Sequence, residues 1–485
     1  MNVMQVRPPV ASQLLRLAAT AAALLVLAAC AVGPDYRRPP DGLHPFQVPV
    51  ESPTESVDSD AVERDSWWTG FGDPLLTQFV ETARAANLSV AASLSRVQAA
   101  RALARYAGEQ LLPAVGAESQ AARTQVSLES PIGQIASHLP GFDRSQTSYE
   151  VGASASWEID LFGGLRRGRQ AARAQFEAVE AAHTGVRITV SADTADSYLT
   201  IRGLQARRRL VIRQIDIAKQ VLDLTSQKYR SGVANVRELS AAEAQLLQLK
   251  ASLEPLDLYL VIEANRLDVL LGEQPGTSMP RLAELADIPH IPDIPGPGST
   301  TEVLRRRPDV IAAERALAAS TARIGQSLAA YYPKFSIAGL AGSAATHTTT
   351  LFTSTTFQTE AVAGLRWRLF DFGRVSAEVE VARAQRAEAL AEYRASVLHA
   401  AEDVENAFTA LARRQAVQSR MEALVEALDR SLSAAQESRR AGAESQLGVL
   451  EAERQLLQAQ EGLARARQDC ALAAVGTFRA IGGGW

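Results

Sequence analysis

Few side chains in this sequence have the spacing that catalysis or metal binding requires. Glu402, Asp403 and Glu405 form the densest carboxylate group, which could in principle serve as a general acid and base. On a long helix the same carboxylates are most simply a solvated face. The six histidines are scattered, and no pair of them has the spacing of metal ligands. We therefore expect no enzymatic activity, no cofactor and no metal.

One residue, Cys30, has a context that predicts covalent modification. A basic region precedes the uncharged stretch 17–27, which is about half the ~20 apolar residues that a membrane-spanning helix needs. This pattern is typical of a secretory signal, and it ends in Leu-Ala-Ala-Cys at 27–30, which resembles a bacterial lipobox. We predict that residues 1–29 are removed and that Cys30 carries diacylglycerol and an N-acyl chain. The alternative is an ordinary cleavage site with an incidental cysteine.

The residue after this cysteine predicts the destination. Lipoproteins that Gram-negative bacteria keep in the inner membrane generally have Asp there, whereas this chain has Ala31. We therefore expect a lipid-anchored protein of the outer membrane.

The composition excludes several classes of protein. With 485 residues the chain exceeds the roughly 250 to 300 residues at which one hydrophobic core stops growing. Fifty Lys and Arg stand against 54 Asp and Glu, spread along the chain, so a nucleic-acid binder is not expected. Two cysteines cannot build a disulfide framework or a Cys-rich zinc site.

The chain contains one unit used twice. At an offset of 210 residues the matches run without a gap and align Trp157 with Trp367. Upstream the offset is 220, which aligns Pro113 with Pro333. Such a period is far longer than the ~20 to 50 residues of solenoid repeats. We therefore expect an internally duplicated fold.

Both units have the same predicted order of elements. Alanine-rich helices at 74–112 and 308–332 end at prolines, which cannot continue a helix. The strands 147–159 and 357–369 alternate apolar and polar residues. Two long helices complete each unit, and the heptad spacing of leucines on the returning helix from 239 to 267 predicts coiled-coil-like packing.

Changes in composition suggest where the chain divides. After the signal peptide at 1–29 we expect an extended segment at 30–66, a first repeat at 67–279, a Pro/Gly-rich linker at 280–299 and a second repeat at 300–485.

The alternating strands suit either a soluble, half-buried sheet or a tilted membrane strand with one apolar face. Four strands cannot close a membrane barrel, because the smallest have about eight and open edges in lipid leave backbone groups unpaired. If the strands span a membrane, several chains must each contribute four. Periodicity alone does not decide between two and three chains.

Several motifs, in this order and spacing, resemble those of the TolC-like outer membrane factors, and most closely the NodT-type lipoproteins of efflux systems. Besides the lipobox and the duplicated strand-to-helix junctions, they are VGPDY at 32–36, WWTGFGDPL at 67–75 and RRRPD at 305–309. The resemblance covers essentially the whole mature chain. It implies a mainly α fold with a transmembrane β-barrel portion: a homotrimer whose twelve-stranded barrel is continuous with a periplasmic α-helical barrel.

The resemblance also implies a function and its partners. A TolC-like chain is the passive exit duct of a tripartite efflux system, joined to a periplasmic adaptor and an inner-membrane pump, often of the resistance-nodulation-division type. The alternative is a lipid-anchored periplasmic coiled coil with a structural or adaptor role, against which the alternating strands argue.

Two sets of site residues follow from the resemblance. The turns between the long helices would contact the adaptor, and capping of the helix ends is the simpler explanation of their composition. They comprise Arg230, Ser231, Gly232, Arg440, Ala441 and Gly442. The periplasmic aperture would be lined by Leu447 and Glu451, next to Gly448 where TolC has a further acidic residue.

Overall fold

The computed structural model describes residues 31–40, 44, 46, 66–284, 286–294 and 299–483. Cys30 and the signal peptide lie outside these residues. The chain forms two compact units. One unit contains the N-terminal segment to Arg38 with Ala99–Glu177 and Glu314–Ala391, and the other contains Pro39–Gln98, Ala178–Ala313 and Glu392–Trp485.

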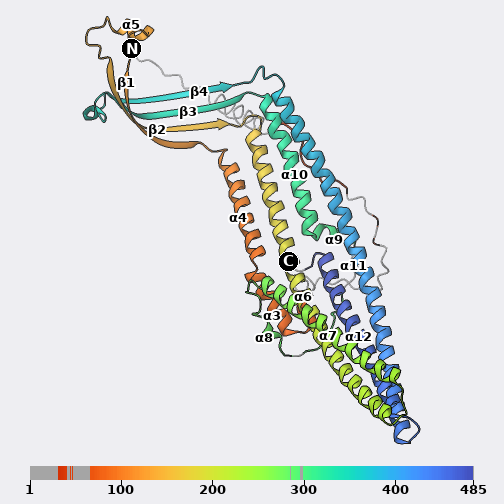
Figure 1. Cartoon of the computed structure of the whole chain (residues 1–485). Helices are drawn as coiled ribbons and strands as arrows, with labels where there is room; N and C mark the ends of the chain where they lie inside the picture. The colour runs from red at the N-terminus through yellow and green to blue at the C-terminus, as the bar shows by residue number, and fades with distance from the viewer. Residues whose placement is uncertain are drawn as a thin grey trace, which may run out of the picture. The chain divides into compact units, whose positions relative to one another are not determined.

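The first unit contains a four-stranded antiparallel sheet with the strand order β1-β2-β3-β4 (Figure 1). The strands are β1 (Ala114–Gln125), β2 (Ser145–Ile159), β3 (Lys334–Ala345) and β4 (Phe357–Arg366). Each repeat therefore contributes one hairpin, and β2 pairs with β3 where the two hairpins meet. A short helix, α5 (Pro131–Ala136), lies between β1 and β2, and the 3-10 turn η3 (Thr348–Thr350) lies between β3 and β4.

The strand β4 ends three residues earlier than the alternation in the sequence predicts. Its last residue, Arg366, pairs with Lys334, the first residue of β3. Pro333 precedes Lys334 and has no amide hydrogen to continue the ladder. The indole of Trp367 instead donates a hydrogen bond of 2.9 Å to the carbonyl of Tyr331.

The first predicted helix of repeat one is two helices, α3 (Pro74–Ala86) and α4 (Leu88–Glu109). Asn87 separates them because its side-chain oxygen accepts hydrogen bonds from the amides of Ser89 and Val90, which caps α4. Its amide nitrogen donates to the carbonyl of Leu270 at 2.9 Å. In repeat two the corresponding segment is α10 (Pro308–Leu328) followed by η2 (Ala329–Tyr331).

Four long helices form the two helical hairpins: α6 (Gly164–Arg230) with α7 (Val236–Leu270), and α11 (Arg374–Arg440) with α12 (Gln446–Ala480). The glycines inside α6 do not interrupt it. A Cβ atom at Gly203 would lie 2.3 Å from Oε1 of Gln468, so this glycine allows α12 to approach closely. The helix α7 continues through Pro255.

The main hydrophobic core of the second unit includes the residues with which the first repeat begins. The turn η1 (Trp67–Phe71) buries both tryptophans, and the ring of Trp67 stacks on Phe478 with centroids 5.1 Å apart. Two short helices, α8 (Met279–Leu282) and α9 (Thr300–Arg306), flank the proline-rich segment. Across the described ranges, no helix combines the length and the apolar character needed to cross a membrane.

The expected mainly helical, internally duplicated fold with a small β part is therefore confirmed.

Candidate functional site

The turn between α6 and α7 is fixed by backbone hydrogen bonds and a glycine. The amide of Val233 donates to the carbonyl of Lys228 at 2.8 Å, and Gly232 has the left-handed φ of 75° that this helix ending requires. Asn235 then begins α7, because its side chain accepts a hydrogen bond from the amide of Glu238 at 3.0 Å. The sequence places Arg230, Ser231 and Gly232 at this turn, and the structure agrees.

The turn between α11 and α12 repeats this geometry 210 residues later. The amide of Ala443 donates to the carbonyl of Ser438 at 2.9 Å, and Gly442 has a φ of 78°. Ser445 caps α12 through a 3.0 Å hydrogen bond from the amide of Gly448. Both turns lie in the second unit, at the same end of the two hairpins (Figure 1).

The surface of both turns is exposed and carries cations. Arg230, Arg440 and Ala441 are exposed, and at the first turn Val233 and Val236 leave 75% and 63% of their surface in solvent. Capping alone explains the glycines but gives no reason for exposed apolar side chains. The turns therefore have the exposed apolar and cationic groups that a protein partner could bind.

The predicted aperture residues lie in the first two turns of α12. Leu447 is half-buried, whereas Glu451 is exposed and lies one turn further along the same helix face. Leu450 and Leu457 of this helix pack with Ile217 of α6, and neither Leu447 nor Glu451 belongs to that cluster. The aperture residues therefore do not belong to the packed α6–α12 interface.

Glu451 is not an isolated charge. Arg454 donates hydrogen bonds of 2.5 and 2.9 Å to its two carboxylate oxygens, and Gln455 donates another at 3.0 Å. These bonds, that from Arg454 first, lower the pKa of Glu451 below its ordinary value. The i, i+3 spacing of Glu451 and Arg454 is the only sign of this ion pair in the sequence.

The carboxylate group at 402–405 has a structural use in the second unit. Asp403 accepts a hydrogen bond of 2.8 Å from Arg307, whose guanidinium also contacts Asp309 at 2.7 Å and the carbonyl of Ala480 at 2.9 Å. Glu402 contacts His399 at 3.4 Å. A cleft of about 730 Å³ adjoins Arg307, and its three arginines all have acidic partners.

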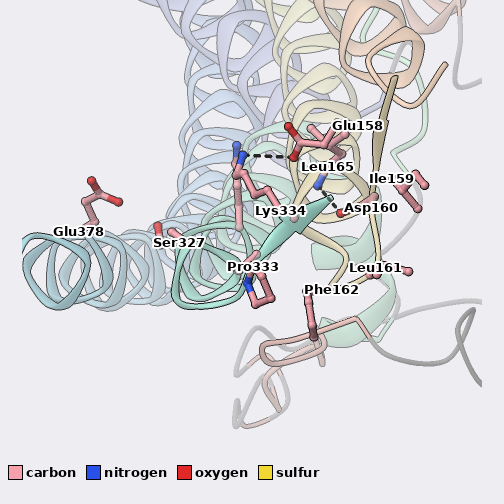
Figure 2. A pocket seen from close by; sticks show the side chains of 14 residues that line it. Glu158, Ile159, Asp160, Leu161, Phe162, Leu165, Ser327, Pro333, Lys334 and Glu378 are labelled. Atoms are coloured by element: carbon pink, nitrogen blue, oxygen red, sulfur yellow. Dashed lines mark hydrogen bonds and ion pairs between the residues drawn. The ribbon is translucent and has the colours of Figure 1, made fainter. Parts of the chain in front are cut away.

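The strand-to-helix junction of repeat one lies in the first unit and surrounds a second, smaller cleft of about 300 Å³ (Figure 2). Lys334 forms an ion pair of 3.2 Å with Glu158 at its edge. Asp160 accepts hydrogen bonds from the amides of Leu165 and Arg166 and so caps α6. These groups stabilise the junction and leave no nucleophile beside a base.

The N-terminal segment is held at the same junction. The amide of Val32 donates to the carbonyl of Phe162 at 3.1 Å. Arg167, which is buried, donates to the carbonyls of Val32 and Gly33 at 3.1 Å each and to Asp35 at 2.8 Å. Residue 31 and its neighbours are therefore fixed to the start of α6, directly after the predicted lipid-bearing cysteine.

A half-buried carboxylate that sequence reasoning missed is Asp196 on α6. Burial raises its pKa to about 7, with repulsion from Asp193 and Glu263 adding to the effect and attraction from Arg479 and Arg266 opposing it. One oxygen of Asp196 and one of Glu263 are buried without a hydrogen-bond partner. No group of three or more His, Cys, Asp or Glu within the described part of the chain could hold a metal ion.

Comparison with known proteins agrees with this architecture. The family model described as "Outer membrane efflux protein" matches residues 79–273 and 300–483. The pyoverdine export outer membrane protein OpmQ of Pseudomonas putida (strain KT2440) is 33% identical over 363 residues, which is 74% of this chain and 75% of that protein. Nodulation protein T of Rhizobium leguminosarum bv. trifolii is 29% identical over 403 residues, 83% of each chain.

A solved structure of the outer-membrane channel OprN superposes with a TM-score of 0.80 at 30% identity, covering 94% of this chain and all of that one. The helical hairpins and the four-stranded sheet are thus shared with a channel over nearly their whole length. The chain belongs to the outer membrane efflux protein family, and it is an outer-membrane efflux channel.

Proposed function

We propose that three copies of this chain assemble into the passive exit duct of a tripartite efflux system. Twelve strands, four from each copy, would close a barrel in the outer membrane, and the long helices would form a tube in the periplasm. The four-stranded sheet supports this proposal. Among the described residues each of its outer strands pairs on one side only, and such edges in lipid are costly unless another chain pairs with them.

The two capped turns are the proposed contacts with a periplasmic adaptor. The observation that supports adaptor binding is that the two turns have the same backbone geometry. Each has an exposed arginine at a helix end that is capped by glycine. In a trimer they would present six similar sites in a ring. An inner-membrane pump, of the resistance-nodulation-division type, would supply the transported compounds through the adaptor.

Small molecules such as drugs are the proposed cargo. One relative is named for the export of pyoverdine. Among the described residues the lysine and the arginines that line the clefts are engaged in ion pairs, which favours a duct that conducts what the pump delivers.

The lipid on Cys30 would anchor the chain beside its strand-to-helix junction. Val32 is bound to Phe162, so a lipid two residues earlier would lie close to the end of β2. This position supports an acyl anchor in the same membrane as the strands.

The function is tested by deletion and reconstitution. Loss of the gene should increase sensitivity to the compounds that the system exports, and the purified protein should form oligomers that conduct ions in planar bilayers. Complementation by the wild type but not by the Gly232→Val and Gly442→Val double variant would support adaptor docking at the turns. A monomeric, non-conducting protein would contradict the duct.

A further inference from the structure

The two β-hairpins differ in the loops at the ends of the strands that are not joined to the long helices. The offsets of 220 and 210 residues that relate the two repeats differ by ten, and these ten residues lie in the loop between β1 and β2. Gln125, which ends β1, corresponds to Ala345, which ends β3, and Thr147 of β2 corresponds to Phe357, which begins β4. The loop between β3 and β4 is short and rich in threonine, whereas the longer loop between β1 and β2 contains α5 (Figure 1).

The inserted loop exposes one apolar side of α5. Ile132, Ile135 and Leu139 leave 75%, 72% and 61% of their surface in solvent. Gly133 lies ~160° around the helix from Ile135 and is buried, and a Cβ atom there would lie 1.9 Å from the carbonyl oxygen of Ser127. The glycine side therefore holds α5 against the start of the loop, and the apolar side has no cover among the described residues. Exposed apolar groups gathered in this way mark a site of interaction.

The register of the hairpin places this loop at one boundary of the membrane. One face of the hairpin is apolar, as at Val115 opposite Ala155, and in an outer-membrane barrel such a face contacts lipid. On this face Trp157 lies at the end joined to the helices, and Arg123 lies opposite Thr147 at the other end. The ten residues from Trp157 to Thr147 span ~33 Å along the strand. At a tilt of ~40° this length covers ~25 Å of the membrane normal, the height of the apolar band in such barrels. Arg123 therefore lies at the outer boundary of the apolar band, where α5 begins to project.

Two exposed arginines at this level are oriented by the loop itself. Nε of Arg123 donates a hydrogen bond of 3.3 Å to Oγ of Ser145, and Nε of Arg144 donates one of 3.0 Å to the carbonyl of Val126. Within the described ranges the terminal nitrogens of both guanidinium groups have no acceptor. They can therefore donate to the oxygens of a phosphate group, which arginine binds strongly. In repeat two the residue equivalent to Arg123 is Ser343, so this cationic group belongs to the first repeat alone.

We infer that the β1–β2 loop binds lipid A in the outer leaflet of the outer membrane. Arg123 and Arg144 would bind a phosphate of its head group, and the apolar side of α5 would enter the boundary of its acyl chains. Two observations favour lipid A over a second copy of this chain as the occupant: the loop lies at the level of the head groups, and contact among the loops would bring arginines of several copies together. The inference rests on the proposed barrel and adds to it a glycolipid site on each copy.

Titration of the purified full-length protein with fluorescent lipid A in detergent micelles tests the phosphate contact. The double variant Arg123→Gln and Arg144→Gln should bind lipid A at least tenfold more weakly than the wild type. Glu129→Gln changes the charge of the same loop at an exposed position and should leave the affinity unchanged. Equal affinities of the wild type and the double arginine variant would overturn the inference. Binding of phosphatidylglycerol as tightly as lipid A would also overturn it, because the site would then recognise any lipid phosphate.

A fluorescent label on α5 tests the apolar contact separately. Ile135→Cys, labelled with a polarity-sensitive dye, should shift its emission to the blue when lipid A is added to phosphatidylethanolamine vesicles that contain the protein. Gln134→Cys, an exposed neighbour on the same helix, is the matched control and should shift less. Cys470 is buried and does not compete for the label. Equal spectra at both positions would overturn the lipid contact, and disulfide-linked dimers of Ile135→Cys would assign this side of α5 to another copy instead.

Conductance in planar bilayers separates failure of this inference from failure of the proposed function. The arginine and α5 variants change exposed residues of a loop, so they should assemble and conduct ions like the wild type. Oligomers that conduct but do not discriminate lipid A through Arg123 and Arg144 would overturn the glycolipid site alone. A wild-type protein that neither assembles nor conducts would overturn the proposed duct, and the glycolipid site with it.

Discussion

Arg307 donates a hydrogen bond of 2.8 Å to Asp403 and thereby connects the residue before α10 to the middle of α11. The same guanidinium binds Asp309 and the carbonyl of Ala480 at the end of α12. Burial opposes the charge on Arg307, but the hydrogen bonds and charges of Asp309 and Asp403 outweigh it and raise its pKa. One buried cation therefore joins three helices of the second unit.

Replacing Arg307 by Met should lower the stability of this unit by about 2 kcal/mol, because carboxylate and carbonyl groups lose their partner. This loss of stability is smaller than for a fully buried ion pair, because the Asp403 side chain is 56% exposed and water screens the interaction. The measurement is the thermal unfolding midpoint in detergent. Arg306→Met, at an exposed neighbouring position, should leave the midpoint unchanged. Equal shifts for both variants would contradict the role of Arg307.

Asp196 should make the stability depend on pH. Because its pKa is raised to about 7 in the folded chain, the folded state binds more protons than the unfolded state between about pH 4 and 7. Stability contributed by the neutral carboxyl is therefore present at low pH and is lost as the pH rises toward 7 and above. Asp196→Asn should raise the unfolding midpoint at pH 8 and reduce its pH dependence.

The control for this titration is Asp223→Asn, at an exposed site on the same helix. It should change neither the midpoint nor its slope with pH. A pH dependence that persists unchanged in Asp196→Asn would rule out this carboxyl as its source.

Replacing the glycine of either turn by a residue with a side chain should strain the backbone of that turn. Gly232 and Gly442 have left-handed φ angles of 75° and 78°, so valine at either position should cost roughly 1 to 2 kcal/mol of backbone strain. Export and adaptor cross-linking should fall more than oligomer formation does. Asn, which tolerates this conformation, is the matched control. Unchanged susceptibility and cross-linking in the double valine variant would remove the docking assignment.

The aperture residues should control ion passage. Glu451→Gln leaves the charge of Arg454 without its partner and should therefore decrease cation selectivity in planar bilayers. Arg454→Gln should increase it, and Leu447→Ala should raise the conductance. Glu453, two residues and ~200° around the helix from Glu451, is the control. Equal effects of Glu451→Gln and Glu453→Gln would place the aperture on another face.

The lipid anchor has a direct assay. Cys30→Ser removes the thiol that would carry the diacylglycerol, so the precursor should remain unprocessed and should not incorporate labelled fatty acid. Assembly into oligomers should survive, because the strands are buried in the membrane independently of the acyl chains. Undiminished labelling would contradict the lipobox.

Local patterns in the sequence were sufficient to predict the helices and strands and to show that they occur twice. The 210-residue offset predicts that Gly232 and Gly442 end equivalent helices, and both have the same backbone geometry. Proline at 113 and 333 predicts where helices stop before the strands, and the structure agrees. Such features depend on backbone constraints within a few residues, which the sequence contains directly.

Contacts between distant segments required the tertiary structure. The bonds of Arg307 to Asp403 and Ala480, and of Arg167 to Val32, join residues about a hundred or more positions apart, and no spacing rule connects them. The raised pKa of Asp196 likewise arises from burial, which depends on how helices pack. The repeated elements follow from local propensity and periodicity, which any stretch of the sequence contains. The ion pairs and buried charges form only when folding brings remote side chains together.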